Sequence, residues 1–443
     1  MLSIVYSGVY NGKLDNRFVC ARFGTFRQRN INLNLKTFIN AKQSAIAEWQ
    51  RALVLGDSEK IFQEEFEKGA EADPDILRHH IHRIAVALNP SRKEQVERQL
   101  AEGHAGKRML AICDFSQIPY TFDLVVFLFV ANRARMDQGC DKLDIVFVAH
   151  ASDPVPQNNP PEMRLEEYYR MLIDNIGWQG TRLLETVGSV MCFDNRELFQ
   201  RFFEKARQTH DIYPSYYYPS NPVYRTSTEY EEAYFLINLY EHAEPEDVMC
   251  LKVPDAELQI AKKWIRKYVY PAVPVTLTLR QFDHLAHKNT NLDIWSDVAN
   301  RFLSKDIVFI VVPEFYRAFD APELTGDNIV YCDEAVLSLP FRAALYELSA
   351  FNIFGNNGSG ALALLSTKMD YIWFDTGGLM SARSEELKRR EGLVPGERFR
   401  NASERQRVVW GDFGTDEAEQ EIKIMLELLS NDGSLSPKWY STV

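Results

Sequence analysis

The sequence predicts an α/β protein in which two Rossmann-like domains face each other across a cleft, after an N-terminal, mainly helical region. Apolar runs of strand length alternate with helix-length segments, a pattern typical of parallel sheets covered on both faces. The alternation occurs twice along 443 residues, a length that suggests two to three domains. Pro271 and Pro274 separate the two series, as expected of an interdomain connection.

These observations set the domain boundaries at 1–106, 107–272 and 273–443. In the first region, apolar residues recur three to five positions apart between Leu33 and Gly103, the spacing of helices that bury one face. The second and third regions each hold one α/β series.

The first α/β series opens with an apolar run that ends in a carboxylate, Asp114. In order, we expect strands over 108–114, 143–149 and 187–193, and helices over 122–135, 165–176, 197–207 and 256–268. The strands are apolar almost throughout, which fits burial on both faces. The stretch 213–224 is rich in Tyr and Pro and is expected to form a structured loop.

The second series follows the prolines. We expect strands over 275–279, 307–312, 328–332, 351–354 and 371–374, and helices over 292–303, 341–349 and 417–429. The segment 381–407 is strongly charged and is expected to be mobile.

Composition excludes several classes of protein. The chain is 46% hydrophobic and 25% charged, as in soluble globular proteins, and its net charge of −12 argues against a nucleic-acid-binding surface. The six cysteines form no CxxC pair, so buried thiols are expected. A signal peptide and an apolar run of about 20 residues are both missing, which predicts a cytoplasmic protein and leaves peripheral membrane contact open.

Candidate site residues follow the predicted strands, because ligands of such folds bind beyond the carboxyl ends of the strands. Asp114 lies there in the first series, and Arg280 and Glu314 lie there in the second. An Arg at this edge can bind phosphate oxygens with two parallel hydrogen bonds. The alternative is a structural salt bridge with a neighbouring carboxylate.

The turn after the strand 351–354 is the strongest candidate for a phosphate site. Asn356, Asn357, Gly358 and Ser359 precede Gly360 and an apolar run. This layout aims backbone N–H groups at whatever lies beyond the strand, and the glycines allow close approach. The alternative is an ordinary turn capped by Asn and Ser.

The second half resembles glycosyltransferases of the GT-B type, especially the GDP-fucose-dependent fucosyltransferases. The likeness covers about residues 273–375 and rests on Arg280-Gln281-Phe282-Asp283, on the helix motif of 344–349 and on the Ser-containing turn of 354–359. The family motif usually begins with His, where this chain has Thr278, and the first half shows no such likeness.

The resemblance implies transfer of a sugar from a nucleotide-sugar donor to a glycan or lipid-linked acceptor, as in bacterial surface polysaccharide synthesis. It implies that Arg280 binds the donor diphosphate, with Asp283 nearby, and that Ser359 and the surrounding amides hold phosphate or ribose. Glu314 is a candidate partner for a ribose hydroxyl or a base N–H.

A catalytic base is also required, because an inverting transfer needs a carboxylate or His beside the acceptor hydroxyl. We favour Asp114, with Asp123 and Asp153 as competitors. The alternative for Asp114 is a cap on the following turn.

We expect no metal ion and no other cofactor. Asp73-Pro74-Asp75 is the tightest Asp-x-Asp and lacks a preceding strand, so a helix cap explains it better than metal binding. His79, His80 and His82 are expected on a solvated helix face.

Two other functions stay open. One is a nucleotide-sugar epimerase or hydrolase on the same scaffold. The other is a non-catalytic binding or assembly subunit whose helical N-terminal region docks a protein partner.

Overall fold

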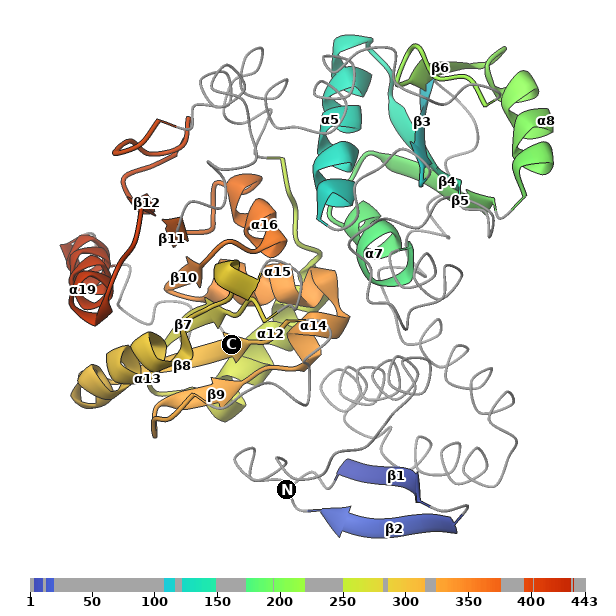
Figure 1. Cartoon of the computed structure of the whole chain (residues 1–443). Coiled ribbons are helices and arrows are strands. Elements are labelled where there is room, and N and C mark those ends of the chain that lie inside the picture. The colour runs from blue at the N-terminus through green and yellow to red at the C-terminus, as the bar shows by residue number, and fades with distance from the viewer. Residues whose placement is uncertain are drawn as a thin grey trace.

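The structure is a computed structural model in which the described residues form one hairpin and two parallel sheets (Figure 1). The described residues are 4–10, 13–19, 107–115, 122–148, 173–193, 195–219, 250–281, 286–314, 324–375, 394–400, 402–431 and 433. Strands β1 (Ile4–Tyr10) and β2 (Lys13–Val19) pair in an antiparallel hairpin. The helices expected between residues 33 and 103 lie outside the described residues.

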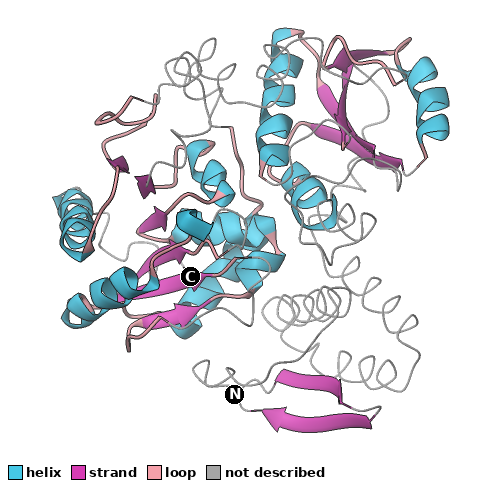
Figure 2. Cartoon of the chain, viewed as in Figure 1, coloured by secondary structure: helices cyan, strands magenta, loops and turns pink. Residues whose placement is uncertain are grey.

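The first α/β half contains a four-stranded parallel sheet in the order β5-β4-β3-β6. Its elements are β3 (Arg108–Asp114), α5 (Asp123–Asp137), β4 (Lys142–Val148), a π-helical turn (Ile173–Gly177), α7 (Trp178–Thr181), β5 (Val187–Phe193), α8 (Arg196–Ala206) and β6 (His210–Tyr213). Alternate residues of β3 pack toward different helices: Met109 toward α5 and Leu110 toward α8. Helices therefore cover both faces of the sheet (Figure 2), as the apolar strands predicted.

The second half contains a six-stranded parallel sheet in the order β12-β11-β10-β7-β8-β9. Its strands are β7 (Val273–Thr278), β8 (Ile307–Val312), β9 (Ile329–Tyr331), β10 (Phe351–Phe354), β11 (Tyr371–Asp375) and β12 (Gln406–Trp410). Its main helices are α12 (Asp255–Tyr268), α13 (Leu292–Arg301), α14 (Glu334–Leu337), α15 (Leu339–Leu348), α16 (Ala361–Leu364) and α19 (Thr415–Asn431). Helices α13 and α19 pack on one face, and α12 and α15 on the other.

Within the two parallel sheets, two strands differ from the sequence prediction. β6 begins in polar residues and ends at Tyr213, where a loop was expected. β12 lies partly inside the charged segment 381–407, which was expected to be mobile, and pairs with β11 at the edge of the sheet. An edge strand needs one apolar face at most, so its sequence lacks the continuous apolar run by which a central strand is recognised.

The strand order places the functional edge of each sheet. In both halves the chain starts at an inner strand, builds outward to one side and then crosses to the other side. The order reverses between β3 and β6 in the first sheet, and between β7 and β10 in the second. Ligands of open α/β sheets bind beyond the carboxyl ends of the strands at such a reversal.

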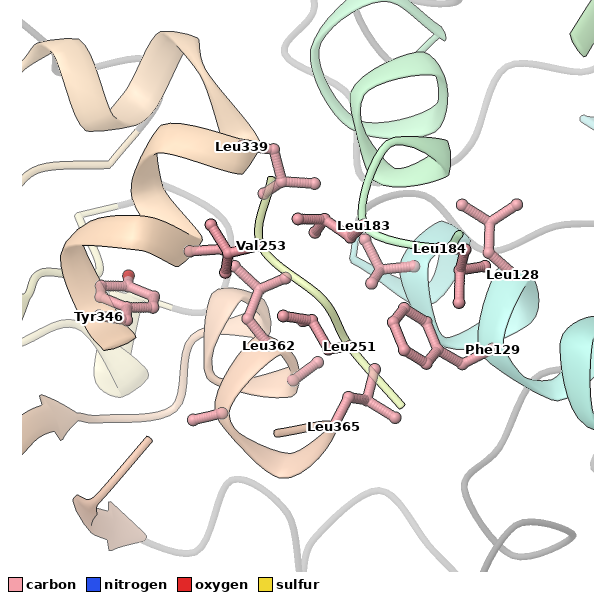
Figure 3. Packing of buried hydrophobic residues seen from close by; sticks show 14 of the residues in the cluster. Leu128, Phe129, Leu183, Leu184, Leu251, Val253, Leu339, Tyr346, Leu362 and Leu365 are labelled. Carbon is pink, nitrogen blue, oxygen red and sulfur yellow. The ribbon is translucent and has the colours of Figure 1, made fainter. Parts of the chain in front are cut away.

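One apolar cluster joins the two halves. Figure 3 shows Leu183 and Leu184 of the first half beside Leu339 and Leu362 of the second, and all four belong to the same buried cluster. The chain segment 250–254 runs between the halves (Figure 3) and bonds to both. Its Leu251 N–H donates to the Leu365 carbonyl at 3.0 Å, and its Lys252 N–H donates to the Leu183 carbonyl at 3.0 Å.

The side-chain amide of Gln179 adds a polar clamp across the same junction. Its Nε2 donates to the Leu337 carbonyl at 3.1 Å, and its Oε1 accepts from the Leu339 N–H at 2.6 Å. Helix α12 packs against α15, although it precedes residue 272. The boundary at residue 272 itself stays a prediction.

Two ion pairs connect the first half to the segment that carries α12. Arg182 pairs with Glu257, and their side chains are only 4% and 1% exposed. Lys252 pairs with Glu185, and these side chains are 57% and 61% exposed. The two pairs link similar parts of the chain but differ strongly in their access to water.

A buried carboxylate joins all four strands of the first sheet. Asp144 of β4 accepts two hydrogen bonds from Arg108 of β3 at 2.5 Å each and one from Ser189 of β5 at 2.5 Å. His210 of β6 lies 3.3 Å from the same carboxylate. Burial alone would raise the pKa of Asp144, but hydrogen bonds from His210, Arg108 and Ser189 outweigh burial and lower the pKa from 3.8 to about 2.

Among the described residues, no helix is both long and apolar enough to cross a bilayer.

The two ion pairs at the junction should differ in energy. Glu257→Ala leaves the buried Arg182 guanidinium without its partner and should lower the free energy of unfolding by about 3–5 kcal/mol. The matched variant Glu185→Ala removes an exposed partner of Lys252 and should cost about 0–1 kcal/mol. Urea unfolding measures both. Equal losses would contradict the assignment of Arg182–Glu257 as a buried link between the halves.

The hydrogen bonds of Asp144 should make the free energy of unfolding depend on pH. Because the folded-state pKa of Asp144 is lowered, its charge contributes about 2 kcal/mol above pH 4, and this contribution is lost as pH falls toward about 2. In urea unfolding, Asp144→Asn should therefore be clearly less stable than the wild type at neutral pH, and the gap should narrow at about pH 3. The exposed Asp416→Asn should change stability by less than about 0.5 kcal/mol. A gap that stays constant with pH would refute the network.

Candidate functional site

Arg280 and Glu314 lie next to each other at the carboxyl edge of the second sheet. They follow the paired strands β7 and β8, whose register is continued by a hydrogen bond from the Leu279 N–H to the Val312 carbonyl at 2.9 Å. Burial lowers the pKa of Arg280, while the negative charge of Glu314 acts in the opposite direction. Both residues therefore lie at the carboxyl edge, as predicted. Glu314 is also near enough to act on the charge of Arg280, as the salt-bridge alternative requires.

The Arg280 side chain is positioned from behind by the loop before α13. Its NH1 donates to Asn289 Oδ1 at 2.6 Å. The backbone of Arg280 exchanges two hydrogen bonds with Thr290, one to the Thr290 hydroxyl at 2.8 Å and one from the Thr290 N–H at 2.9 Å. A half-buried guanidinium fixed in this way is suited to hold an anion at the strand ends.

The turn 356–360 lies across the strand reversal from Arg280. Asn357 Nδ2 donates to the Thr278 carbonyl at the end of β7, at 3.2 Å. Asn357 Oδ1 accepts from the Gly360 N–H at 3.2 Å and from the Ser359 hydroxyl at 2.9 Å. These bonds tie the turn to β7 and account for the capping alternative. The phosphate contacts expected of Asn356, Asn357, Gly358 and Ser359 stay predictions.

The two glycines of the turn are approached by aromatic rings. A Cβ at Gly360 would overlap the ring of Trp373 on β11, and a Cβ at Gly358 would lie 3.1 Å from Cβ of Phe122. Phe122 precedes α5 of the first half. The glycines therefore serve packing, and Gly358 brings the carboxyl edge of the second sheet against the start of α5.

The turn is followed by a short helix. A single 3-10 turn (Gly358–Gly360) leads into the four residues of α16.

In the first half, Asp114 lies at the end of β3, as predicted, and is buried. Its two oxygens accept from NH1 and NH2 of Arg196 at 2.8 and 2.7 Å, and one of them also accepts from the Tyr217 hydroxyl at 2.7 Å. Burial and the neighbouring charge of Asp114 raise the pKa of Tyr217. The strand reversal between β3 and β6 is thus occupied by the protein's own side chains.

These contacts satisfy the buried carboxylate of Asp114, and its role as catalytic base stays a prediction. Sequence reasoning did not find the partners of Asp114. Arg196 follows the helix cap Asn195, and Tyr217 lies in the Tyr-rich loop, so each had a local signal but no signal of mutual contact.

Several other candidates are placed only in part. Asp123, a competitor for the catalytic base, is the first residue of α5. Asp283, Asp153, the pair Asp73/Asp75 and the His79–His82 cluster lie outside the described residues. Within the described part of the chain, no group of three His, Cys, Asp or Glu side chains is arranged to hold a metal ion.

No protein-family model and no curated protein matches this sequence. Solved structures do align with this chain at low similarity. A glycosyl transferase family 9 protein from Veillonella parvula is 8% identical, with a TM-score of 0.38, over 72% of this chain and 91% of its own. The E. coli ADP-heptose LPS heptosyltransferase II is 9% identical, with a TM-score of 0.41, over 73% of this chain and 99% of its own.

A third structure, E. coli heptosyltransferase WaaC with ADP-2-deoxy-2-fluoro heptose, is 11% identical, with a TM-score of 0.38, over 71% of this chain and 99% of its own. None of these three is a fucosyltransferase. At these identities and TM-scores the likenesses carry no argument about activity.

The packing of Gly360 against Trp373 predicts that alanine substitutions at Gly360 and Gly355 differ in their effect on stability. Gly360→Ala should lower the free energy of unfolding by about 1–3 kcal/mol, because the new methyl group overlaps Trp373. Gly355→Ala is the control, since a Cβ there meets nothing within 4 Å, and its effect should stay within about 0.5 kcal/mol. Thermal unfolding without ligand measures both. If Gly360→Ala is as stable as Gly355→Ala, packing does not explain the glycine.

Proposed function

We propose that this protein is a glycosyltransferase that binds a nucleotide-sugar donor on its second α/β half. The observation that carries the proposal is the position of Arg280 and of the turn 356–360 on either side of the strand reversal between β7 and β10. A nucleotide diphosphate bound there would lie against a guanidinium and beside backbone N–H groups.

The chemistry of this edge fits the departure of a nucleoside diphosphate. Negative charge grows on the diphosphate as the bond between the donor sugar and the diphosphate breaks. A fixed cation such as Arg280 stabilises that charge without reorganising. Glu314 would accept a hydrogen bond from a ribose hydroxyl or from the base. In this proposal the enzyme needs no metal ion.

The first half supplies the acceptor side. The contact between Gly358 and Phe122 supports this arrangement, because it joins the carboxyl edge of the second sheet to the start of α5. Asp114 is the proposed base that takes the proton from the acceptor hydroxyl. For this role the Tyr217 hydroxyl must leave Asp114, so that the acceptor hydroxyl can take its place.

The acceptor is a glycan or a lipid-linked sugar of a bacterial surface polysaccharide. The hexosyl or fucosyl nature of the donor sugar and a peripheral position at the membrane belong to the proposal as well.

A nucleotide-binding screen tests the proposal directly. Purified protein is heated with ADP, GDP, UDP, CMP or TDP, with and without EDTA, and the melting temperature is measured. One nucleotide at about 100 times its Kd should add about 2.7 kcal/mol of stability, with or without EDTA. Arg280→Ala should lose this shift. Arg301→Ala, which removes an exposed Arg paired with Asp416 and Glu419 on α19, should keep it.

Other outcomes would decide against the proposal. If no nucleotide stabilises the folded wild type, the donor site is absent and a non-catalytic assembly subunit becomes the better explanation. Release of free nucleotide from a nucleotide sugar without an acceptor would instead indicate a hydrolase.

A further inference from the structure

Arg342 carries a buried positive charge. Only 6% of this residue is exposed, yet no ion pair of Arg342 with Asp or Glu occurs among the described residues. Its Nε donates to the Ala335 carbonyl at 2.8 Å, and its guanidinium carbon lies 5.8 Å from the ring centre of Phe122. A buried charge is costly unless it is paired, so a guanidinium with no carboxylate partner among the described residues is suited to bind an anionic ligand.

The other buried Arg of the junction shows what pairing looks like. Arg182 is similarly buried and has Glu257 as a partner. Near Arg342, the neighbouring carboxyl along the chain is Glu334, but burial raises the pKa of Glu334 to about 7, and the cation that acts on it is Lys267. No ion pair joins Glu334 to Arg342 among the described residues.

The position of Arg342 in the fold favours a ligand at this place. Arg342 lies in the first turn of the ten-residue helix α15, which begins after the Ser338 cap and leads into β10. A helix that leads into a parallel strand starts near the carboxyl edge of the sheet, where ligands bind, and its N-terminal N–H groups add positive potential. Phe122, under the guanidinium, also touches Gly358 of the candidate turn.

We propose that Arg342 binds a phosphate group at the junction of the two halves, as a second cationic contact besides Arg280. This inference rests on the proposed function and extends it. The phosphate comes either from the donor diphosphate or from a phosphorylated lipid acceptor, and both present the same oxygens to the guanidinium. Phe122 holds the guanidinium plane by a cation–π contact and leaves its edge for the anion.

The test replaces Arg342 by an uncharged side chain of similar size. Arg342→Met should melt at or above the temperature of the unliganded wild type, because it removes a buried unpaired charge. Arg182→Met is the matched control and should melt at a lower temperature, because it removes the cation that pairs with the buried Glu257 carboxylate. A drop for Arg342→Met as large as for Arg182→Met would show a structural role and overturn the inference.

Binding is measured on the same variants with three probes: inorganic pyrophosphate, the nucleoside diphosphate that stabilises the wild type, and a polyprenyl monophosphate in detergent micelles. Arg342→Met should bind at least one probe about tenfold more weakly than the wild type. Loss with pyrophosphate and the nucleotide identifies the donor as the source of the phosphate. Loss confined to the polyprenyl phosphate identifies the acceptor.

The two proposals can fail separately. If Arg280→Ala abolishes nucleotide binding while Arg342→Met binds every probe as the wild type does, the proposed function stands and the Arg342 site is refuted. If the wild type binds none of the probes, both are refuted.

Discussion

The apolar junction between the two halves is the constraint on which the rest of the structure depends. Leu128 of α5 and the leucines at 183 and 184, just after α7, pack with leucines of α15 and α16 in a cluster that is continuous with the core of each half. The segment 250–254 is hydrogen-bonded to both sides, and Gln179 clamps two backbone groups of the second half. Sliding one half along the other would break these directional bonds and open buried apolar surface together, so the two carboxyl edges keep a defined relation.

This relation decides what the candidate site can do. In the proposed function, the nucleotide is held at one strand reversal with Arg280 beside it. Transfer to a second substrate also needs a second surface within reach, and the contact between Phe122 and Gly358 brings the start of α5 to that point. Arg280, on one side of the second sheet's reversal, and Arg342, at the start of α15, then place two cations near one junction of a chain whose net charge is −12. Local charge of this kind is independent of the overall charge.

Much of the fold follows from the sequence, because parallel strands that are buried on both faces appear in the sequence as continuous apolar runs. This rule predicted the strands β3, β4, β7, β8 and β10. The periodic spacing of apolar residues predicted the amphipathic helices α12 and α13. β6 and β12 were missed, since short or edge strands carry weak patterns. The hairpin of β1 and β2 was missed as well, in a region read as mainly helical.

The positions of the candidate residues were predictable from the sequence, but their contacts were not. A residue that follows a parallel strand must lie at the carboxyl edge, and this rule placed Asp114, Arg280 and Glu314. The pairing of Asp114 with Arg196 and Tyr217 joins residues 82 and 103 positions apart, and no local pattern encodes such a contact. The role of Arg342 could not be predicted either, because in the sequence it is one cation in an apolar helix. Only the structure shows that Arg342 is buried and forms no ion pair with a described Asp or Glu.

The hydrogen bonds of the segment 250–254 also bear on how the chain can be divided. Because α12 packs on α15, a cut at the proline boundary would separate a helix from the sheet that it covers. A cut before residue 250 would keep α12 with its sheet but strip Leu183 and Leu184 of their cover. Neither piece should behave as an autonomous module, so this protein is best expressed, evolved and recombined as one unit.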